Sequence, residues 1–208
     1  SDYTIREYIC NFIMSKLEAN QVDPATGTTL TLGTSGDTIT IPSGVTIANS
    51  GTATGFGGTM TPAFFVRNSG DQSITSGTIT KVTLPTEDLD TDNCFDNSTN
   101  YRFTPTTAGK YFFFACGRGK ANSGTLNYSN VLIRKNGTAG AGNTFTASST
   151  EQYTSPGNTA NATVNVILDM NGSSDYVEMY MQIGGTQPKI KSDNNGNPTM
   201  FGGYKIIE

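Results

Sequence analysis

The strongest hydrophobic pattern in this chain is an aromatic hairpin. Tyr101 and Phe103 are followed by a segment with Pro105 and Gly109, and then by the run Tyr111–Ala115, which contains three successive phenylalanines. Proline presets a turn dihedral and glycine tolerates positive φ, so this spacing predicts two short strands joined by a turn. Because consecutive strand residues point to opposite faces, the three phenylalanines predict a strand that is buried on both sides.

A different periodicity marks residues 1–19, which form the one convincing helix pattern. Their apolar residues recur at 3.6-residue spacing, with Thr4 and Glu7 placed as a capping box, and Asn20 and Pro24 mark the end. We expect four side chains to anchor this helix on a partner: Ile5, Ile9, Phe12 and Ile13. Two interpretations stay open, a short coiled coil at the end of a trimer and a peg that docks in a larger assembly.

Within residues 26–61, the stretch 26–56 shows strict alternation of apolar residues between glycines, and residues 55–61 are predicted to form a hinge. Each apolar pair spans a strand too short to form a stable sheet within one chain. Three copies wound about an axis would each contribute one apolar row, so the pattern predicts a slender trimeric β shaft followed by a hinge. The expected core residues of the shaft are Leu30, Leu32, Ile39, Ile41, Val45 and Ile47. A disordered linker is the alternative, although linkers seldom keep apolar residues in register.

Several motifs follow one another in residues 62–208. They are the hairpin Phe103–Phe113, the turn Arg134–Gly137, the strand Ser174–Met179 and the closing Phe201-Gly202. In order and spacing this series resembles the globular head of C1q-like proteins, whose jelly-roll fold is shared with tumour-necrosis-factor-like proteins. The resemblance implies an all-β jelly-roll sandwich head over residues 62–208, joined to the shaft (26–61) and to the N-terminal helix or anchor (1–25). It also implies a homotrimer.

A second resemblance concerns the shaft. The segment Asp37–Gly55 resembles shaft segments that recur in tail and capsid fibres of tailed bacteriophages. Met14–Asn20 likewise resembles the start of phage fibre proteins, which leaves open whether residues 1–13 are an upstream extension. These resemblances imply a structural virion fibre protein, located on the phage particle surface, whose N-terminal helix contacts another virion protein.

Composition narrows the chemistry. The chain has 208 residues, 24 glycines, 14% charged residues and a net charge of −4. Many short β-branched runs between turn residues indicate an all-β protein. Mild acidity argues against nucleic-acid binding, and no run approaches the length of a transmembrane helix, so membrane insertion is not expected.

The sequence contains no histidine, which excludes Ser-His and Cys-His dyads and imidazole metal ligands. Three cysteines, Cys10, Cys94 and Cys116, form no C-x-x-C pair. Three free thiols are favoured, with a Cys94–Cys116 pair as the alternative. We expect no cofactor and no metal, although Asp88–Asn93 has alternating carboxylates that leave a loose calcium site open.

The function predicted from these features is adhesion to a host surface glycan or protein, without enzymatic activity. Counting strands back from the C-terminus places the loops 118–127, 154–161 and 184–198 at one end of the head, where binding residues usually lie. The candidate receptor-binding residues are Arg118, Lys120, Asn122, Lys189, Lys191, Asp193 and Asn194.

Two alternatives remain. A polysaccharide depolymerase would need two acids close together, and the head offers Asp169, Asp175, Glu178 and Asp193. A free lectin-like binding module is the other alternative.

Overall fold

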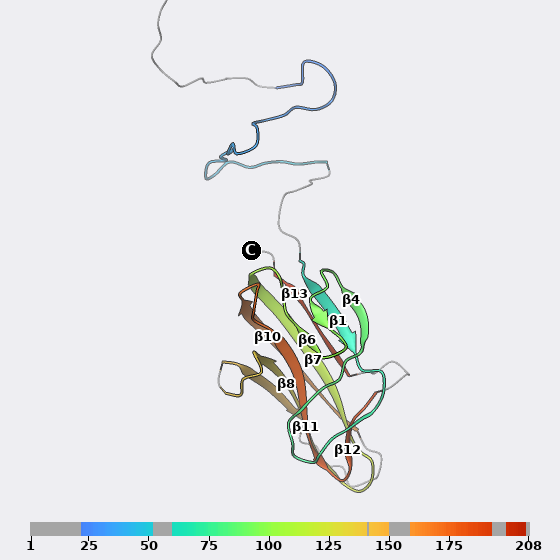
Figure 1. Ribbon diagram of the computed structural model, residues 1–208. Helices are drawn as coiled ribbons and strands as arrows, with labels where there is room; N and C mark the ends of the chain where they lie inside the picture. Colours follow the sequence, from blue (N-terminus) through green and yellow to red (C-terminus); the bar gives the residue numbers. More distant parts are fainter. Residues whose placement is uncertain (1–21, 52–59, 141, 150–158, 193–198, 207–208) are drawn as a thin grey trace, which may run out of the picture. The chain divides into compact units, whose positions relative to one another are not determined.

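The computed structural model describes residues 22–51, 60–140, 142–149, 159–192 and 199–206 (Figure 1). The chain divides into two compact units, Ser1–Thr52 and Ala53–Glu208. The expected N-terminal helix and its anchor residues lie outside the described residues.

The described part of the first unit, residues 22–51, has neither helix nor strand. Hydrogen bonds close turns at Thr34–Asp37 and Pro42–Val45, with N–O distances of 3.0 and 3.2 Å. These turns separate the apolar pairs that the sequence predicts as shaft residues. A single chain therefore adopts no strand pairing there, and the trimeric shaft remains a proposal.

The described part of the second unit contains strands and no helix. The strands are β1 (Ala63–Arg67), β2 (Gln72–Ser73), β3 (Thr80–Lys81), β4 (Thr86–Asp90), β5 (Phe95–Asp96), β6 (Arg102–Phe103), β7 (Gly109–Ala121), β8 (Leu126–Lys135), β9 (Thr144–Ser149), β10 (Thr159–Met170), β11 (Val177–Gly185), β12 (Pro188–Ile190) and β13 (Met200–Lys205).

The strands form two antiparallel sheets. In the seven-stranded sheet, β7 pairs with β10 on one side and with both β12 and β13 on the other. Strand β12 continues to β2, and β13 continues to β1 and β4. The six-stranded sheet runs β5-β6-β11-β8-β9, with β3 also on β11. After β7 the chain crosses to β8 and β9, returns to β10, crosses to β11 and returns to β12 and β13. This alternation between sheets defines a jelly-roll sandwich.

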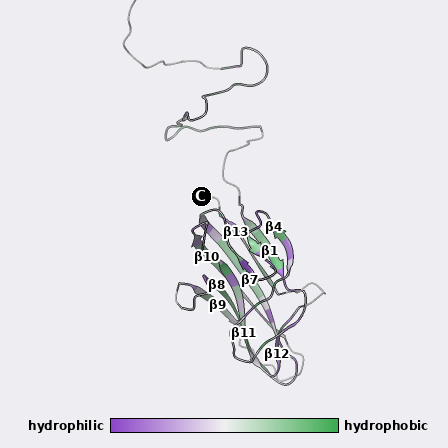
Figure 2. Ribbon diagram, in the orientation of Figure 1, coloured by the Kyte–Doolittle hydropathy of each residue, from purple (hydrophilic) through white to green (hydrophobic). Residues whose placement is uncertain are grey.

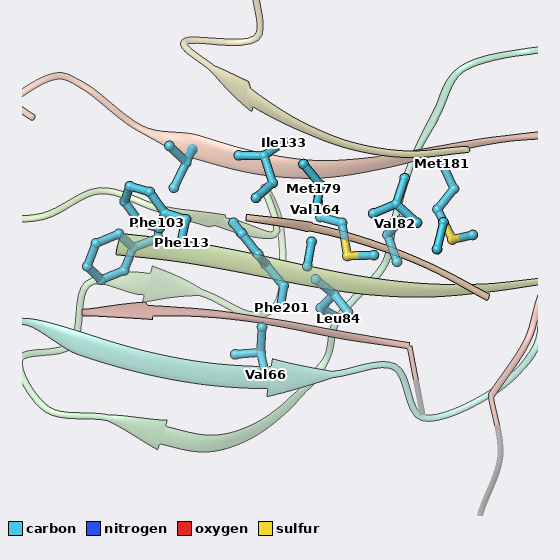
Figure 3. Packing of buried hydrophobic residues seen from close by; sticks show 14 of the residues in the cluster. Val66, Val82, Leu84, Phe103, Phe113, Ile133, Val164, Met179, Met181 and Phe201 are labelled. Atoms are coloured by element: carbon cyan, nitrogen blue, oxygen red, sulfur yellow. The ribbon is translucent and has the colours of Figure 1, made fainter. Parts of the chain in front are cut away.

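The core lies between the two sheets. In Figure 3, Met179 and Ile133 come from the six-stranded sheet and face Phe113 and Phe201 from the other sheet. All four are fully buried. Aromatic rings fill one part of the core, where Phe64 and Phe103 stack at 4.3 Å between centroids. Aromatic side chains bury large apolar areas, so this cluster supplies much of the driving force for folding.

The prediction that strand β7 is buried on both sides does not hold within a single chain. Phe113 is fully buried in the core, whereas Phe112 and Phe114 are only partly buried on the outer face of the sheet. No described part of this chain covers that face completely. Figure 2 shows β7 changing from hydrophobic to hydrophilic along its length, as its sequence passes from Tyr111–Cys116 to Gly117–Lys120.

The glycines in the second half of β7 have a packing role. A Cβ on Gly117 would lie 2.4 Å from Val131 Cγ2 and 2.7 Å from the Met181 sulfur, and a Cβ on Gly119 would lie 2.5 Å from Ser129 Oγ. The six-stranded sheet therefore approaches β7 too closely for any side chain at these inward positions.

The segment 81–84 pairs with β11 through Thr80–Lys81, and Val82 N continues the pairing with a hydrogen bond to Met179 O at 3.0 Å. Val82 and Leu84 are fully buried. The Gln72 side chain also binds the backbone of this segment: its Nε2 donates to Lys81 O (2.9 Å) and its Oε1 accepts from Thr83 N (3.0 Å).

Candidate binding surfaces

The six predicted shaft residues are exposed in the single chain. Their exposed fractions run from 43% for Leu30 to 62% for Leu32. We call these six residues the shaft row, after their alternation in the sequence; large apolar side chains at this exposure have no partner in the described part of their own chain. The row is a candidate interaction surface.

A second apolar surface covers the outer face of the seven-stranded sheet. Rings from three adjacent strands meet there, with centroid distances of 6.1 Å for Phe65–Phe114, 6.4 Å for Phe112–Phe114 and 5.6 Å for Phe112–Tyr204. Ile167 lies opposite Phe112 and is 58% exposed. We call this surface the aromatic face and define it by Phe65, Phe112, Phe114, Ile167 and Tyr204.

The doubled glycine in β13 gives room to rings on both sides of the sheet. A Cβ on Gly202 would lie 2.5 Å from Phe114 Cζ on the aromatic face, and a Cβ on Gly203 would lie 2.4 Å from Phe113 Cδ1 in the core. The three phenylalanines of β7 therefore require this Gly-Gly step in the neighbouring strand. Phe65 and Tyr204 were not predicted from the sequence, although the paired aromatic residues Phe64-Phe65 carry the same two-sided signal as β7.

The predicted receptor-binding residues cluster at the Ala121 end of β7, but several lie on strands rather than in loops. Arg118 and Lys120 belong to β7, and Lys189 belongs to β12, directly opposite Lys120 in the register. The expected loops 118–127 and 184–198 are shorter than predicted because β7 and β11 extend into them. Asp193 and Asn194 lie outside the described residues.

Hydrogen bonds tie these segments together. Asn122 N donates to Gln187 O at 3.2 Å, and Lys191 N donates to Arg118 O at 2.8 Å. Lys191 Nζ also forms an ion pair with Asp71 at 3.1 Å. The structure therefore brings Arg118, Lys120, Asn122, Lys189 and Lys191 to one end of the sandwich; their role in receptor binding stays a prediction.

A cavity of about 330 Å³ opens at this end. Its lining is Ser73, Ile74, Asn122, Gln187, Pro188 and Lys189. Of these residues, the sequence indicated only Asn122 and Lys189 as candidates. The others lie in or directly beside β2 and β12, which are too short to give a recognisable pattern.

The three described carboxylates among those considered for a depolymerase each face a lysine. Asp169 pairs with Lys110 at 2.5 Å, and Asp175 pairs with Lys135 at 2.8 Å. Glu178 is 3% exposed; Lys81 Nζ donates to its Oε1 at 2.5 Å and the Tyr180 hydroxyl donates to its Oε2 at 2.7 Å. Asp193 lies outside the described residues.

The Glu178 carboxylate also affects its tyrosine partner. Burial, and then the hydrogen bond to Glu178, raise the pKa of Tyr180 above its usual value. Arg134 lies over the Tyr180 ring at 4.8 Å from the centroid. This network fixes the outer face of the six-stranded sheet.

In the candidate calcium loop, one carboxylate group accepts hydrogen bonds from nearby backbone N–H groups. Asp90 accepts hydrogen bonds from Cys94 N at 3.0 Å and Phe95 N at 2.8 Å. Within the described ranges, no three His, Cys, Asp or Glu side chains gather as a metal site would require.

Cys94 and Cys116 are both free thiols, and Cys10 is outside the described part. No helix among the described residues has the length and apolar character to cross a membrane.

The strand order above defines the class of this unit as a jelly-roll domain. No protein-family model matches the chain, and no curated protein matches it by sequence. Similar solved structures are TNF-like and C1q-like jelly-roll domains. The Eiger TNF protein of S. frugiperda has a TM-score of 0.49 and 10% identity, covering 69% of this chain and 91% of that one.

Two further structures are similar in the same way. Murine APRIL has a TM-score of 0.46 and 10% identity, over 69% of this chain and 98% of that chain. The globular domain of zebrafish complement 1qA has a TM-score of 0.43 and 17% identity, over 70% and 96%. At these identities the likeness concerns the fold alone.

Proposed function

We propose that this chain is a homotrimeric fibre protein of a tailed-phage virion, in which the jelly-roll unit adheres to the host cell surface. The observation that carries the proposal is the pair of uncovered apolar surfaces on one chain, the shaft row and the aromatic face. The phage context rests on the resemblance of Asp37–Gly55 to fibre shafts. In this proposal residues 1–25 attach to another virion protein.

A threefold axis accounts for both surfaces at once. Each shaft side chain is about half exposed, so its burial against two other copies contributes about 1 kcal/mol, and on the order of 6 kcal/mol for the six residues of one chain. The aromatic face adds rings that are already ordered by their neighbours, which lowers the entropic cost of association. Trimerisation would also complete the two-sided burial that the sequence of β7 predicts.

Light scattering of the full chain tests the trimer. We expect three times the chain mass of 22.0 kDa at micromolar concentration. The substitution Ile167→Asp places a charge on the aromatic face at an exposed position, and Leu32→Asp does the same in the shaft; together they should give a monomer. Ile79→Asp is the matched control, because Ile79 is 38% exposed and lies outside both surfaces. A stable wild-type monomer would refute the proposal.

Adhesion is the proposed activity of the end that carries Lys120 and Lys189. Loops and strand ends on a rigid scaffold provide binding residues, and three copies multiply weak contacts. The measurement is retention of the labelled trimer on an array of bacterial surface polysaccharides and on whole cells. Retention on none of them would remove adhesion from the proposal.

We propose further that the protein does not act as an enzyme. The sequence has no histidine, and each of the three described candidate acids is engaged by a lysine. Incubation of the purified protein with polysaccharides that retain it should release no reducing sugar. Release above a boiled control would favour the depolymerase instead.

A further inference from the structure

The cavity at the Ala121 end of β7 combines polar and apolar walls. Asn122, Gln187, Ser73 and Lys189 contribute polar side chains, whereas Ile74 and Pro188 contribute apolar surface. Small-ligand sites likewise combine polar groups that fix orientation with apolar surface, although here the polar side chains predominate, and the volume of about 330 Å³ lies at the lower end of the usual range for such sites.

Backbone hydrogen bonds hold the walls in place. Ile74 N donates to Pro188 O at 3.1 Å, and Asn122 N donates to Gln187 O at 3.2 Å. Gln187 has a φ of +50°, which a non-glycine residue adopts at some cost. The Asn122 Nδ2 group donates to Gln187 Oε1 at 3.4 Å, a long hydrogen bond that a ligand hydroxyl can replace. The cavity is therefore formed before any ligand arrives.

The charge at the cavity is positive on a chain of net charge −4. Lys189 lies directly across the β7–β12 pair from Lys120. Like charges at directly opposed positions repel each other. Among the described residues no ion pair joins a carboxylate to either lysine. Against the effect of burial, hydrogen bonds from Ser192 N and Lys191 lower the pKa of Asp71, and the nearby charge of Lys189 contributes to this lowering. The direct contacts of Asp71 are to Lys191 Nζ and Ser192 N. An anion at Lys189 would relieve this repulsion.

We infer that the cavity binds an acidic sugar residue, a uronic acid within a surface polysaccharide. The sugar carboxylate lies at Lys189, with Lys120 beside it, and the amides of Asn122 and Gln187 hydrogen-bond ring hydroxyls. The apolar face of the sugar ring packs on Ile74 and Pro188. A phosphate would gain less here, since the side chains that line the cavity include no arginine to bind it in bidentate fashion. This inference deepens the adhesion proposed above and rests on it.

Calorimetry of the full-length protein tests the assignment with defined probes. The probes are oligogalacturonate and oligoguluronate, each beside its carboxyl-reduced neutral counterpart, at low and high salt. We expect wild-type protein to bind at least one oligouronate, to bind the neutral counterpart at least tenfold more weakly, and to lose affinity as salt rises. The substitution Lys189→Gln should weaken binding tenfold or more.

Lys205→Gln is the matched control. Lys205 is also half-buried, but it pairs with Tyr111 at the opposite end of β7 from Lys120, so the same change in net charge should leave binding unchanged. Thermal midpoints of both variants equal to the wild-type midpoint verify that the fold is intact. Equal losses in the two variants would show an effect of net charge alone and overturn the site.

Two further outcomes would also overturn it. Binding of neither oligouronate removes the acidic sugar, and displacement by inorganic phosphate at equal concentration assigns the cavity to phosphate. If the trimer is nevertheless retained on bacterial polysaccharides, adhesion stands and only the cavity assignment fails. If no polysaccharide retains it, both fail.

Discussion

Gly117 offers the sharpest test of how the two sheets pack. The change Gly117→Ala adds one methyl group at a buried position, where it would lie 2.4 Å from Val131 Cγ2. Carbon atoms at that distance overlap strongly, so the sheets must separate or a side chain must leave its rotamer. Overpacking of this kind costs about 1–3 kcal/mol.

The expected change in thermal midpoint follows from the size of the unit. For domains of this length 1 kcal/mol shifts the midpoint by about 2–4 °C, so Gly117→Ala should lower it by about 2–12 °C. Tyrosine fluorescence reports unfolding, since the chain has nine tyrosines and no tryptophan. All variants are compared at one protein concentration, because association raises apparent stability.

Gly70 serves as the control that separates the effect of packing from the effect of replacing a glycine in the backbone. Gly70 has open space around its Cβ position and no positive φ, so Gly70→Ala should be neutral or stabilise by up to about 1 kcal/mol. Adding Gly117→Ala to a Val131→Ala background should cost less than adding it to wild type, with a coupling of about 0.5–3 kcal/mol. An equal midpoint for Gly117→Ala and Gly70→Ala would refute the close approach of the sheets.

Three other predictions concern charge and exposure. Glu178→Ala should lower the free energy of urea unfolding by about 2–4 kcal/mol, because it removes the carboxylate that pairs with half-buried Lys81. Asp169→Ala breaks an exposed ion pair and should cost less than about 1 kcal/mol. Equal costs for the two variants would contradict this reasoning. The backbone N–H of Thr99, with other donors, holds the pKa of Asp96 below its usual value. A depressed folded-state pKa contributes stability above about pH 4 that is lost as pH falls, so Asp96→Asn should flatten the fall in midpoint between pH 5 and 2; a wild-type slope would refute it. Cys116, partly buried on the outer sheet face, should react with iodoacetamide more slowly in the trimer than in the monomeric double variant, and equal rates would place it outside the interface.

Local chemistry in the sequence determined the strands that alternate strongly. The positions of Tyr111 and Phe113 follow from period-two alternation, and the turn at Asn136-Gly137 follows from two residues that accept positive φ, observed at 56° and 65°. The closing strand near Phe201 was likewise predictable. Each of these depends on residues within a few positions of one another.

Only the tertiary structure decided how distant segments meet. Three phenylalanines predict that both faces of β7 are buried, but the fold shows that one chain covers only the Phe113 side. The sequence around Gly117 carries no local signal of the role of this glycine, because the reason for it is a valine on a strand of the other sheet. The cavity joins the ends of β2, β7 and β12, and the two short strands among them are held by long-range pairing rather than by propensity. Such sites depend on register between segments far apart in the chain, which no local pattern encodes.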